Sequence, residues 1–432
     1  MTSPVVRPPT RDELPDYYRV LPYANGLPHW EPADAAWHGG PEPWPAPRHP
    51  ATEEQLAQWA AEDAADPAFH PVGVFEDGRC VGGSATISFQ VTVPGPRPLP
   101  MAGVTATGVI ATHRRRGHLS AMMRVMFDDA LTRHEPLAML SASEGSIYGR
   151  FGFSPATYRT RIEIDRHEAR FLPAADDTGR LELVRAETAR TIWPVIHERV
   201  RLTRVGELTP QPGRWDRLTD EAAGQTGPLR YLIHQDRNGR PDGIANFRLP
   251  WSATREHAGT LVVEALEATT PEAYRAMWRL LLDFDLTKKV VAPGRPRTEP
   301  LAWMLTSPRA VRITRQSDNL WTRILDLPAA LVGRRYQEQD RLRLRLDDDH
   351  MCPDNNGTWA LDTRNGEPTC ETTGENPDVV LTIRALSSLY LGGMSTYDLA
   401  TAGAITPVDA HALSRLHRLF ATDPEPHNSF AF

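Results

Sequence analysis

This chain has few cysteines, and its cysteines and histidines show no metal-ligand spacing. Only three cysteines occur among the 432 residues, Cys80, Cys352 and Cys370, and their separation fits neither a disulfide framework nor a cysteine metal site. This usage favours a reducing compartment. The 15 histidines show no ligand spacing either, so we expect no bound metal. The run Asp347–Asp349 lacks the alternating oxygen ligands of a calcium loop, and we expect a solvated turn there.

Long apolar runs are also missing. No stretch of about 18 apolar residues is present, which excludes a membrane-spanning helix. The first residues do not combine a basic region with an apolar core, so we expect no secretory signal and a cytoplasmic protein. The net charge of −7 disfavours nucleic acid as a partner. What remains is the composition of a globular protein long enough for about two to four domains.

The stretch 104–153 carries the strongest local pattern. An apolar run at 104–111 is followed by a basic turn at 112–117 and by residues that repeat with the period of a helix: Leu119, Met122, Met123 and Met126. A second apolar run covers 136–140. The pattern predicts a strand, a turn, a helix and another strand.

The turn has the chemistry of an anion site. A helix N-terminus presents unpaired N–H groups and a partial positive charge. Arg114, Arg115 and Arg116 add full charges, and Gly117 allows a ligand to approach the backbone closely. The ligand that fits this combination is a diphosphate.

The same order of elements occurs twice. Residues 72–93 form a predicted hairpin around Asp77-Gly78, and a second hairpin is centred on Asn238-Gly239. Each is followed by an apolar strand and an amphipathic helix, which indicates a duplicated α+β domain. The second helix begins with Pro271-Glu272 in place of the arginines, and Glu272 would repel a phosphate. We therefore expect the second copy to be structural.

The ends of the chain have other patterns. Residues 20–50 combine dense proline and glycine with three tryptophans, which favours an ordered loop over a pocket, although a loop that plugs the domain's own core is an alternative. The alternation in Arg341–Leu346 predicts a half-solvated sheet. The aromatic terminus, which includes Phe430 and Phe432, is expected to be buried.

The segments THRRRGHLSAMM, SASEGSIYGRFGF, LWTRILDLPAAL and LSSLYLGG and the Phe-x-Phe terminus resemble the Eis (enhanced intracellular survival) family of GNAT N-acetyltransferases. The resemblance implies an α+β chain of tandem GNAT-like domains followed by a sterol-carrier-protein-like domain. We expect an active GNAT domain at 1–160, a degenerate one at 161–312 and the third domain at 313–432. The resemblance also implies a homohexamer that uses acetyl-CoA to acetylate amines such as aminoglycosides or lysine side chains. This function is associated with antibiotic resistance.

The resemblance also implies a set of site residues. The acetyl-CoA contacts implied by the matching motifs are Thr107, Gly108, Val109, Arg114, Arg115, Arg116, Gly117, His118, Leu119, Ser120, Ser143 and Glu144. Leu119 departs from the small residue of the general GNAT motif. His113 and His118 flank the arginines, and we expect their imidazoles to be solvated.

Tyr148 matches the family's general acid and the terminal carboxylate of Phe432 its general base. A phenol of pKa near 10 suits reprotonation of a thiolate of pKa about 8.5, and a backbone N–H near Val109 suits a developing oxyanion. A carboxyl of pKa about 3.5 is a poor base unless it is desolvated, so a water relay or an electrostatic role stays open. A core tyrosine and a terminus that only packs are the structural alternatives.

The acceptor is the least constrained part. Ala431 and the loop around Asn25 lack acids found in the best-known relatives, which weakens the case for polycationic aminoglycosides. Trp30 and Trp37 are our candidates for walls of a more apolar entrance. The alternatives are an enzyme that uses a longer acyl-CoA or acylates an apolar metabolite, and a non-catalytic CoA- or lipid-binding protein.

Overall fold

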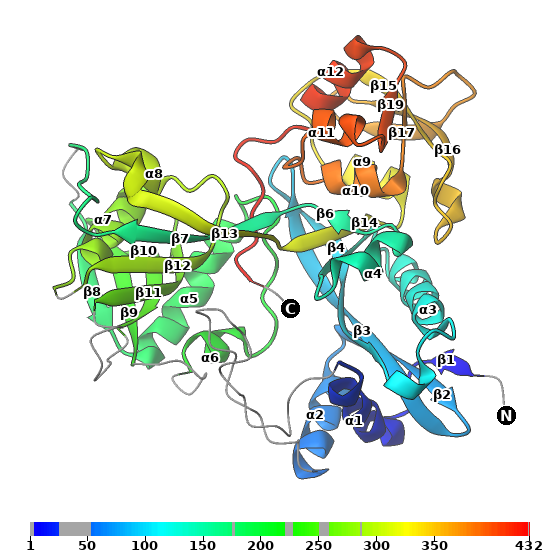
Figure 1. Cartoon of the computed structure of the whole chain (residues 1–432), viewed down its shortest axis with the longest axis horizontal. Coiled ribbons are helices and arrows are strands. Elements are labelled where there is room, and N and C mark those ends of the chain that lie inside the picture. Colours follow the sequence, from blue (N-terminus) through cyan, green and yellow to red (C-terminus); the bar gives the residue numbers. More distant parts are fainter. Residues whose placement is uncertain are drawn as a thin grey trace.

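The structure is a computed structural model that describes residues 4–25, 53–174, 178–220, 228–249, 259–285, 287–430 and 432. Three β-sheets, each covered by helices, form three lobes (Figure 1). Trp30 and Trp37, the candidates for walls of the entrance, lie outside the described residues, as does most of the tryptophan-rich loop at 20–50.

The first sheet has seven strands. Their order is β1 (Val5–Arg7), β2 (Phe69–Glu76), β3 (Arg79–Val93), β4 (Arg97–Val109), β5 (Leu137–Ser141), β14 (Leu320–Ile324) and β6 (Ser154–Pro155). The helices of this lobe are α1 (Leu14–Asn25), α2 (Glu53–Ala65), α3 (His118–Thr132) and α4 (Gly145–Tyr148). The predicted hairpin is confirmed, because β2 and β3 pair and Asp77 and Gly78 both have the positive φ of a tight hairpin turn. The predicted strand, turn, helix and strand are confirmed as β4, α3 and β5.

Strands β4 and β5 separate after a short pairing. They are parallel partners only from Met101–Leu137 to Gly103–Met139. Beyond Gly103, β4 continues to Val109 without β5, while β5 pairs with β14 on its other side as far as Ser141. The β5-facing edge of β4 is therefore open next to the start of α3.

The second sheet repeats this plan. Its order is β13 (Val311–Asp318), β7 (Tyr158–Asp165), β12 (Lys289–Arg295), β11 (Thr260–Ala268), β10 (Pro241–Arg248), β9 (Leu229–Gln235) and β8 (Arg180–Val184). Its helices are α5 (Ala186–Arg201), α6 (Arg214–Leu218), α7 (Pro271–Leu282) and α8 (Leu301–Met304). The parallel pair β11–β12 with α7 between them corresponds to β4, α3 and β5. In this copy the side chain of Thr270 caps the helix by accepting a hydrogen bond from the Ala273 N–H.

The chain crosses between the two sheets twice, and this differs from the expected boundaries. Strand β6 lies in the first sheet and β7 in the second, while β13 and β14 cross in the opposite direction. The expected boundaries at 160/161 and 312/313 fall inside β7 and β13. Strand β14, which was expected to belong to the third domain, completes the first sheet, where its apolar side chains pack beside β5.

The third lobe is a five-stranded sheet with four helices. The strand order is β17 (Thr369–Thr372), β16 (Gly357–Asp362), β15 (Arg341–Leu346), β18 (Val379–Leu381) and β19 (Ile405–Pro407). The helices are α9 (Leu327–Gly333), α10 (Ile383–Leu389), α11 (Thr396–Thr401) and α12 (Ala410–Phe420). The expected alternation in β15 is confirmed, because its three leucines are buried and its arginines face outward.

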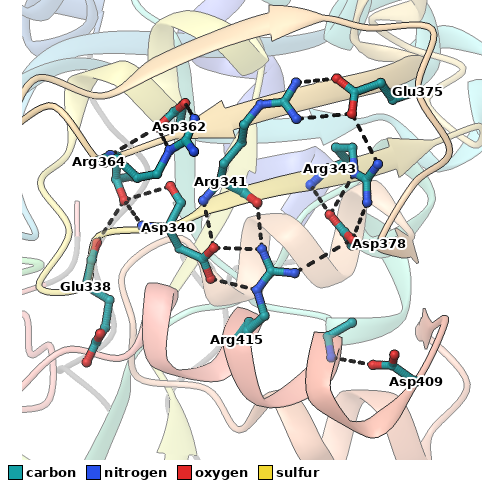
Figure 2. Close-up of polar contacts among 12 residues, drawn as sticks. Glu338, Asp340, Arg341, Arg343, Asp362, Arg364, Glu375, Asp378, Asp409 and Arg415 are labelled. Atoms are coloured by element: carbon teal, nitrogen blue, oxygen red, sulfur yellow. Dashed lines mark hydrogen bonds and ion pairs between the residues drawn. The ribbon is translucent and has the colours of Figure 1, made fainter.

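Paired charges fasten α12 to this sheet. Figure 2 shows Arg415 of α12 between Asp340 and Asp378, with Nε 2.8 Å from an Asp340 oxygen. Arg343 bonds Asp378 at 2.7 Å. These arginines lower the pKa of both aspartates. The cluster is matched in charge among its own members, which makes it a structural network.

Several buried polar contacts dock the third lobe onto the first sheet. The buried hydroxyls of Ser387 and Ser388 on α10 bond the backbone of Ile324 and Pro155. The expectation of a solvated turn at 347–349 is wrong for Asp349, which is 2% exposed. The Asp349 carboxylate lies 2.5 Å from the buried guanidinium of Arg323 on β14. Each of these two charges can be buried at this junction because the other is its partner.

Candidate functional site

The open edge of β4 forms one side of the candidate site. Thr107, Gly108 and Val109 lie on β4 beyond its last pair with β5. A bulge in the β3–β4 pairing coincides with Ala106, which has a φ of 51°. The Ser84 hydroxyl lies 2.7 Å from that of Thr107 and fixes this distorted segment. The backbone polar groups of this edge can pair with an extended ligand as a neighbouring strand would.

The turn before α3 presents an open helix N-terminus. Gly117 is the N-cap with a φ of 86°, and no side chain caps the helix. A Cβ at Gly117 would meet no heavy atom within 4 Å, so the space beside it is free. Arg115 also has a positive φ, 62°. The start of α3 thus has no capping side chain and has open space beside Gly117, as an anion site requires.

The three arginines of this turn have different surroundings. Arg114 donates from Nε to the Val109 carbonyl at 3.0 Å. Arg116 contacts Glu76 at 3.3 Å and donates to the Thr112 carbonyl at 3.0 Å. Arg115 is exposed and has no partner within the part of the chain that the structure describes. Arg115 is therefore the guanidinium available to an anionic ligand.

Glu76, at the end of β2, orders the basic turn. One of its oxygens lies 3.0 Å from His118 Nε2, and the other lies 3.4 Å from His113 Nε2. The expectation of a solvated imidazole is wrong for His118, which is 4% exposed because its ring packs toward Glu76. Because this ring is buried, it is not available to a ligand at the start of α3. Sequence reasoning missed Glu76, because no spacing relates it to residues about 40 positions later.

Tyr148 lies close to two other expected site residues. It ends α4, is 8% exposed and packs edge-to-face on Phe153 with the ring centroids 6.2 Å apart. Burial raises the pKa of Tyr148, while hydrogen bonding with Ser143 and Thr107 acts in the opposite direction. The phenol thus combines a core ring with a hydroxyl beside the open edge of β4. Glu144 is exposed beside this group.

The C-terminus reaches the other face of β4. The ring of Phe432 lies 4.8 Å from that of Phe89, and a Cβ on Gly103 would stand 2.7 Å from it. Gly103 is the last residue of β4 that pairs with β5. Phe432 belongs to the apolar cluster on one side of β4 and Tyr148 to the cluster on the α3 side. The expected burial of the terminus is confirmed for Phe430, which is 8% exposed.

Among the residues that the structure describes, no group of three or more His, Cys, Asp or Glu side chains could hold a metal ion. No helix within the same ranges is long and apolar enough to cross a membrane.

Comparison with known proteins supports the two related lobes and the third one. Residues 44–156 and 206–327 each match an acetyltransferase (GNAT) domain, and residues 327–429 match a sterol carrier protein domain. These matches confirm the α+β fold of tandem GNAT-like domains with a sterol-carrier-protein-like domain.

Relatives in other bacteria match most of this chain. An uncharacterized N-acetyltransferase of Streptomyces coelicolor is 37% identical over 365 residues, which cover 82% of this chain and 87% of the relative. The N-acetyltransferase Eis of Mycobacterium tuberculosis is 34% identical over 360 residues, which cover 82% and 86%. The crystal structure of Eis1 from Mycobacterium abscessus matches with a TM-score of 0.83 and 29% identity, over 99% of this chain and 100% of that one.

Proposed function

Because the chain belongs to the Eis family of GNAT N-acetyltransferases, we propose that it transfers the acetyl group of acetyl-CoA to a primary amine. The observation that carries this proposal is the uncapped start of α3 beside the open edge of β4, with Arg115 free to meet a phosphate. When bound, acetyl-CoA supplies an activated acetyl group on a thiol leaving group. The copy of this turn in the second sheet is capped by Thr270 and carries Glu272, so only the first copy is suited to the cofactor.

The cofactor-binding roles follow from the geometry of the turn. Arg115 and the first N–H groups of α3 would hold the diphosphate, and the edge from Thr107 to Val109 would bind the extended arm. Glu76 acts indirectly, because it orients His118 and Arg116 and keeps the turn in shape.

The proton-transfer roles are divided between the two faces of β4. Tyr148 Oη is protonated at neutral pH, since burial raises its pKa further, and it is suited to give a proton to the departing sulfur. The Phe432 carboxylate is suited to hold the incoming ammonium or to accept its proton on the opposite face. The acceptor in this proposal is a small-molecule amine, which is aminoglycoside-like, lysine-like or another primary amine.

Calorimetric titration with acetyl-CoA tests the cofactor site. Arg115→Gln should weaken binding by about tenfold or more, because it removes a charge-assisted hydrogen bond. Arg124→Gln, an exposed position further along α3, is the matched control and should bind like the wild type. Absence of binding to the wild-type protein would contradict the proposal.

Thiol release with a panel of amines tests the transfer. Extending the chain by two residues beyond Phe432 should abolish turnover and leave acetyl-CoA affinity unchanged, because it moves the carboxylate away from β4. An extended protein that retains full activity would remove the terminal carboxylate from the mechanism.

A further inference from the structure

The last residues of the chain are fixed between the two larger lobes. Figure 1 shows the C-terminal segment leaving the third lobe and ending between the first and second sheets. The His427 N–H donates to the Val205 carbonyl at 2.9 Å, and Asn319 Nδ2 donates to the Asn428 carbonyl at 3.0 Å. Chain termini usually fray unless they are tied down in this way.

Glu207 is the centre of this anchor. It is 0% exposed, and both of its carboxylate oxygens accept from the Ser429 N–H at 3.2 Å. One oxygen also accepts from Ser429 Oγ at 3.0 Å and from Asn428 Nδ2 at 3.4 Å. Arg204 contacts the other oxygen at 3.2 Å. A carboxylate is acceptor-only, so its lone pairs match this set of donors.

The same residue is tied to the strand on which the terminus packs. The Glu207 carbonyl accepts a hydrogen bond from the Thr92 N–H at 2.9 Å, and Thr92 lies on β3. Phe89, three positions earlier on β3, holds the ring of Phe432. Glu207 therefore joins the C-terminal segment to the surface against which its last residue rests.

Phe430 provides a second point of attachment. The Arg214 guanidinium lies 3.7 Å from the centre of its ring, and the His197 ring lies 5.9 Å away. The Phe430 N–H donates to Asn428 Oδ1 at 3.2 Å. The segment is thus held up to two positions before its carboxylate.

We infer that Glu207 is a positioning residue that keeps the Phe432 carboxylate in the acetyltransferase site, an inference that rests on the role proposed above for that carboxylate. The second lobe thereby contributes to the reaction through a residue that touches neither cofactor nor substrate. Its contribution is to hold the terminus of the chain in one place.

Glu207→Gln is the direct test, because it keeps the shape and replaces one acceptor oxygen with an NH2 donor. The Ser429 N–H donates to both carboxylate oxygens of Glu207. In either orientation of the glutamine amide, its NH2 group therefore faces the Ser429 N–H where an oxygen accepted before. In the full-length variant, carboxypeptidase should release Phe432 about tenfold faster than from the wild type, as followed by mass spectrometry. We expect kcat to fall about as much, with KM for acetyl-CoA within about twofold of the wild type.

Two further variants make the test specific. Glu182→Gln is the matched control, because its side chain is 46% exposed and bonds Arg180 away from the terminus; it should keep both wild-type values. Ser429→Ala removes one of the same hydrogen bonds from the other partner, and it should shift both readouts in the same direction even if Glu207→Gln fails to fold.

The outcomes separate the inference from the function on which it rests. Wild-type protection of Phe432 in both variants, or a lower kcat with a protected terminus, would overturn the positioning role. Faster release of Phe432 with an unchanged kcat would retain the anchor and refute the catalytic use of the carboxylate. Failure of the wild-type protein to bind acetyl-CoA would refute the proposed function itself.

Discussion

Replacement of Gly103 by alanine should disturb the terminus from the side of β4. The added Cβ would stand 2.5 Å from Phe89 Cε2 and 2.7 Å from Phe432 Cε2. Carbon atoms prefer separations of about 3.5 to 4.0 Å, so each ring has to move by about 1 Å. Phe89 is buried in the core, whereas Phe432 is only partly buried, so we expect Phe432 to move more.

The expected effect is a loss of turnover with little loss of cofactor binding. A displacement of about 1 Å of a reacting group can cost up to about a hundredfold in rate, so we expect kcat to fall about 10- to 100-fold. Overpacking of this kind should lower the free energy of unfolding by about 1–3 kcal/mol. Acetyl-CoA affinity should stay within about twofold of the wild type, because the turn before α3 is unchanged.

Steady-state kinetics and thermal denaturation measure the two effects separately. The assay temperature must lie well below the melting temperature of the variant. Gly374→Ala is a suitable control, because a Cβ there meets no heavy atom within 4 Å. A Gly103→Ala enzyme with wild-type kcat would refute the placement of Phe432 in the reaction.

Three further substitutions test the phenol, the buried ion pair and the buried imidazole. Tyr148→Phe should lower kcat by about 10²- to 10⁴-fold with unchanged acetyl-CoA affinity, and because the pKa of Tyr148 is raised, the wild type should show no alkaline loss of kcat from this group below about pH 10. Asp349→Ala leaves Arg323 buried without its partner and should lower the free energy of unfolding by about 3–5 kcal/mol in chemical denaturation. Burial lowers the pKa of His197, but its hydrogen bond with Glu267 and that residue's charge outweigh burial, so the pKa is raised in the folded protein. Its stabilisation is therefore complete below the ordinary value of 6.5 and is lost as the pH rises through the raised pKa, and His197→Gln should remove this part of the pH dependence of unfolding.

Local patterns predicted the parts of the fold that depend on neighbours in sequence. The period of Met122, Met123 and Met126 located α3, because a helix buries one face at that spacing. The dipeptide Asp77-Gly78 located the first hairpin, because a tight two-residue turn needs positive φ at both of its central residues. The family resemblance, rather than spacing, supplied the expected roles of Tyr148 and Phe432.

Long-range pairing explains what the sequence did not predict. Strand β14 is a short apolar run, and nothing in its residues states which sheet it joins. Glu76 and Glu207 look like ordinary acids in the sequence, since their partners lie about 40 and more than 200 positions away. Asp349 looked solvated because its counter-charge, Arg323, belongs to another sheet.

The double crossing between the sheets affects the order in which the chain can fold during synthesis. The edge of β5 that pairs with β14 stays unpaired until residues 320–324 leave the ribosome. By that time the whole second sheet has been synthesised. Domains that are contiguous in sequence can close one after another as they emerge, whereas here the first sheet has to wait for a strand from beyond the second. An exposed strand edge in a nascent chain is prone to pair with other chains. We therefore expect fragments that end before residue 320 to aggregate, and the acetyltransferase lobe to be produced intact only together with the lobe that follows it.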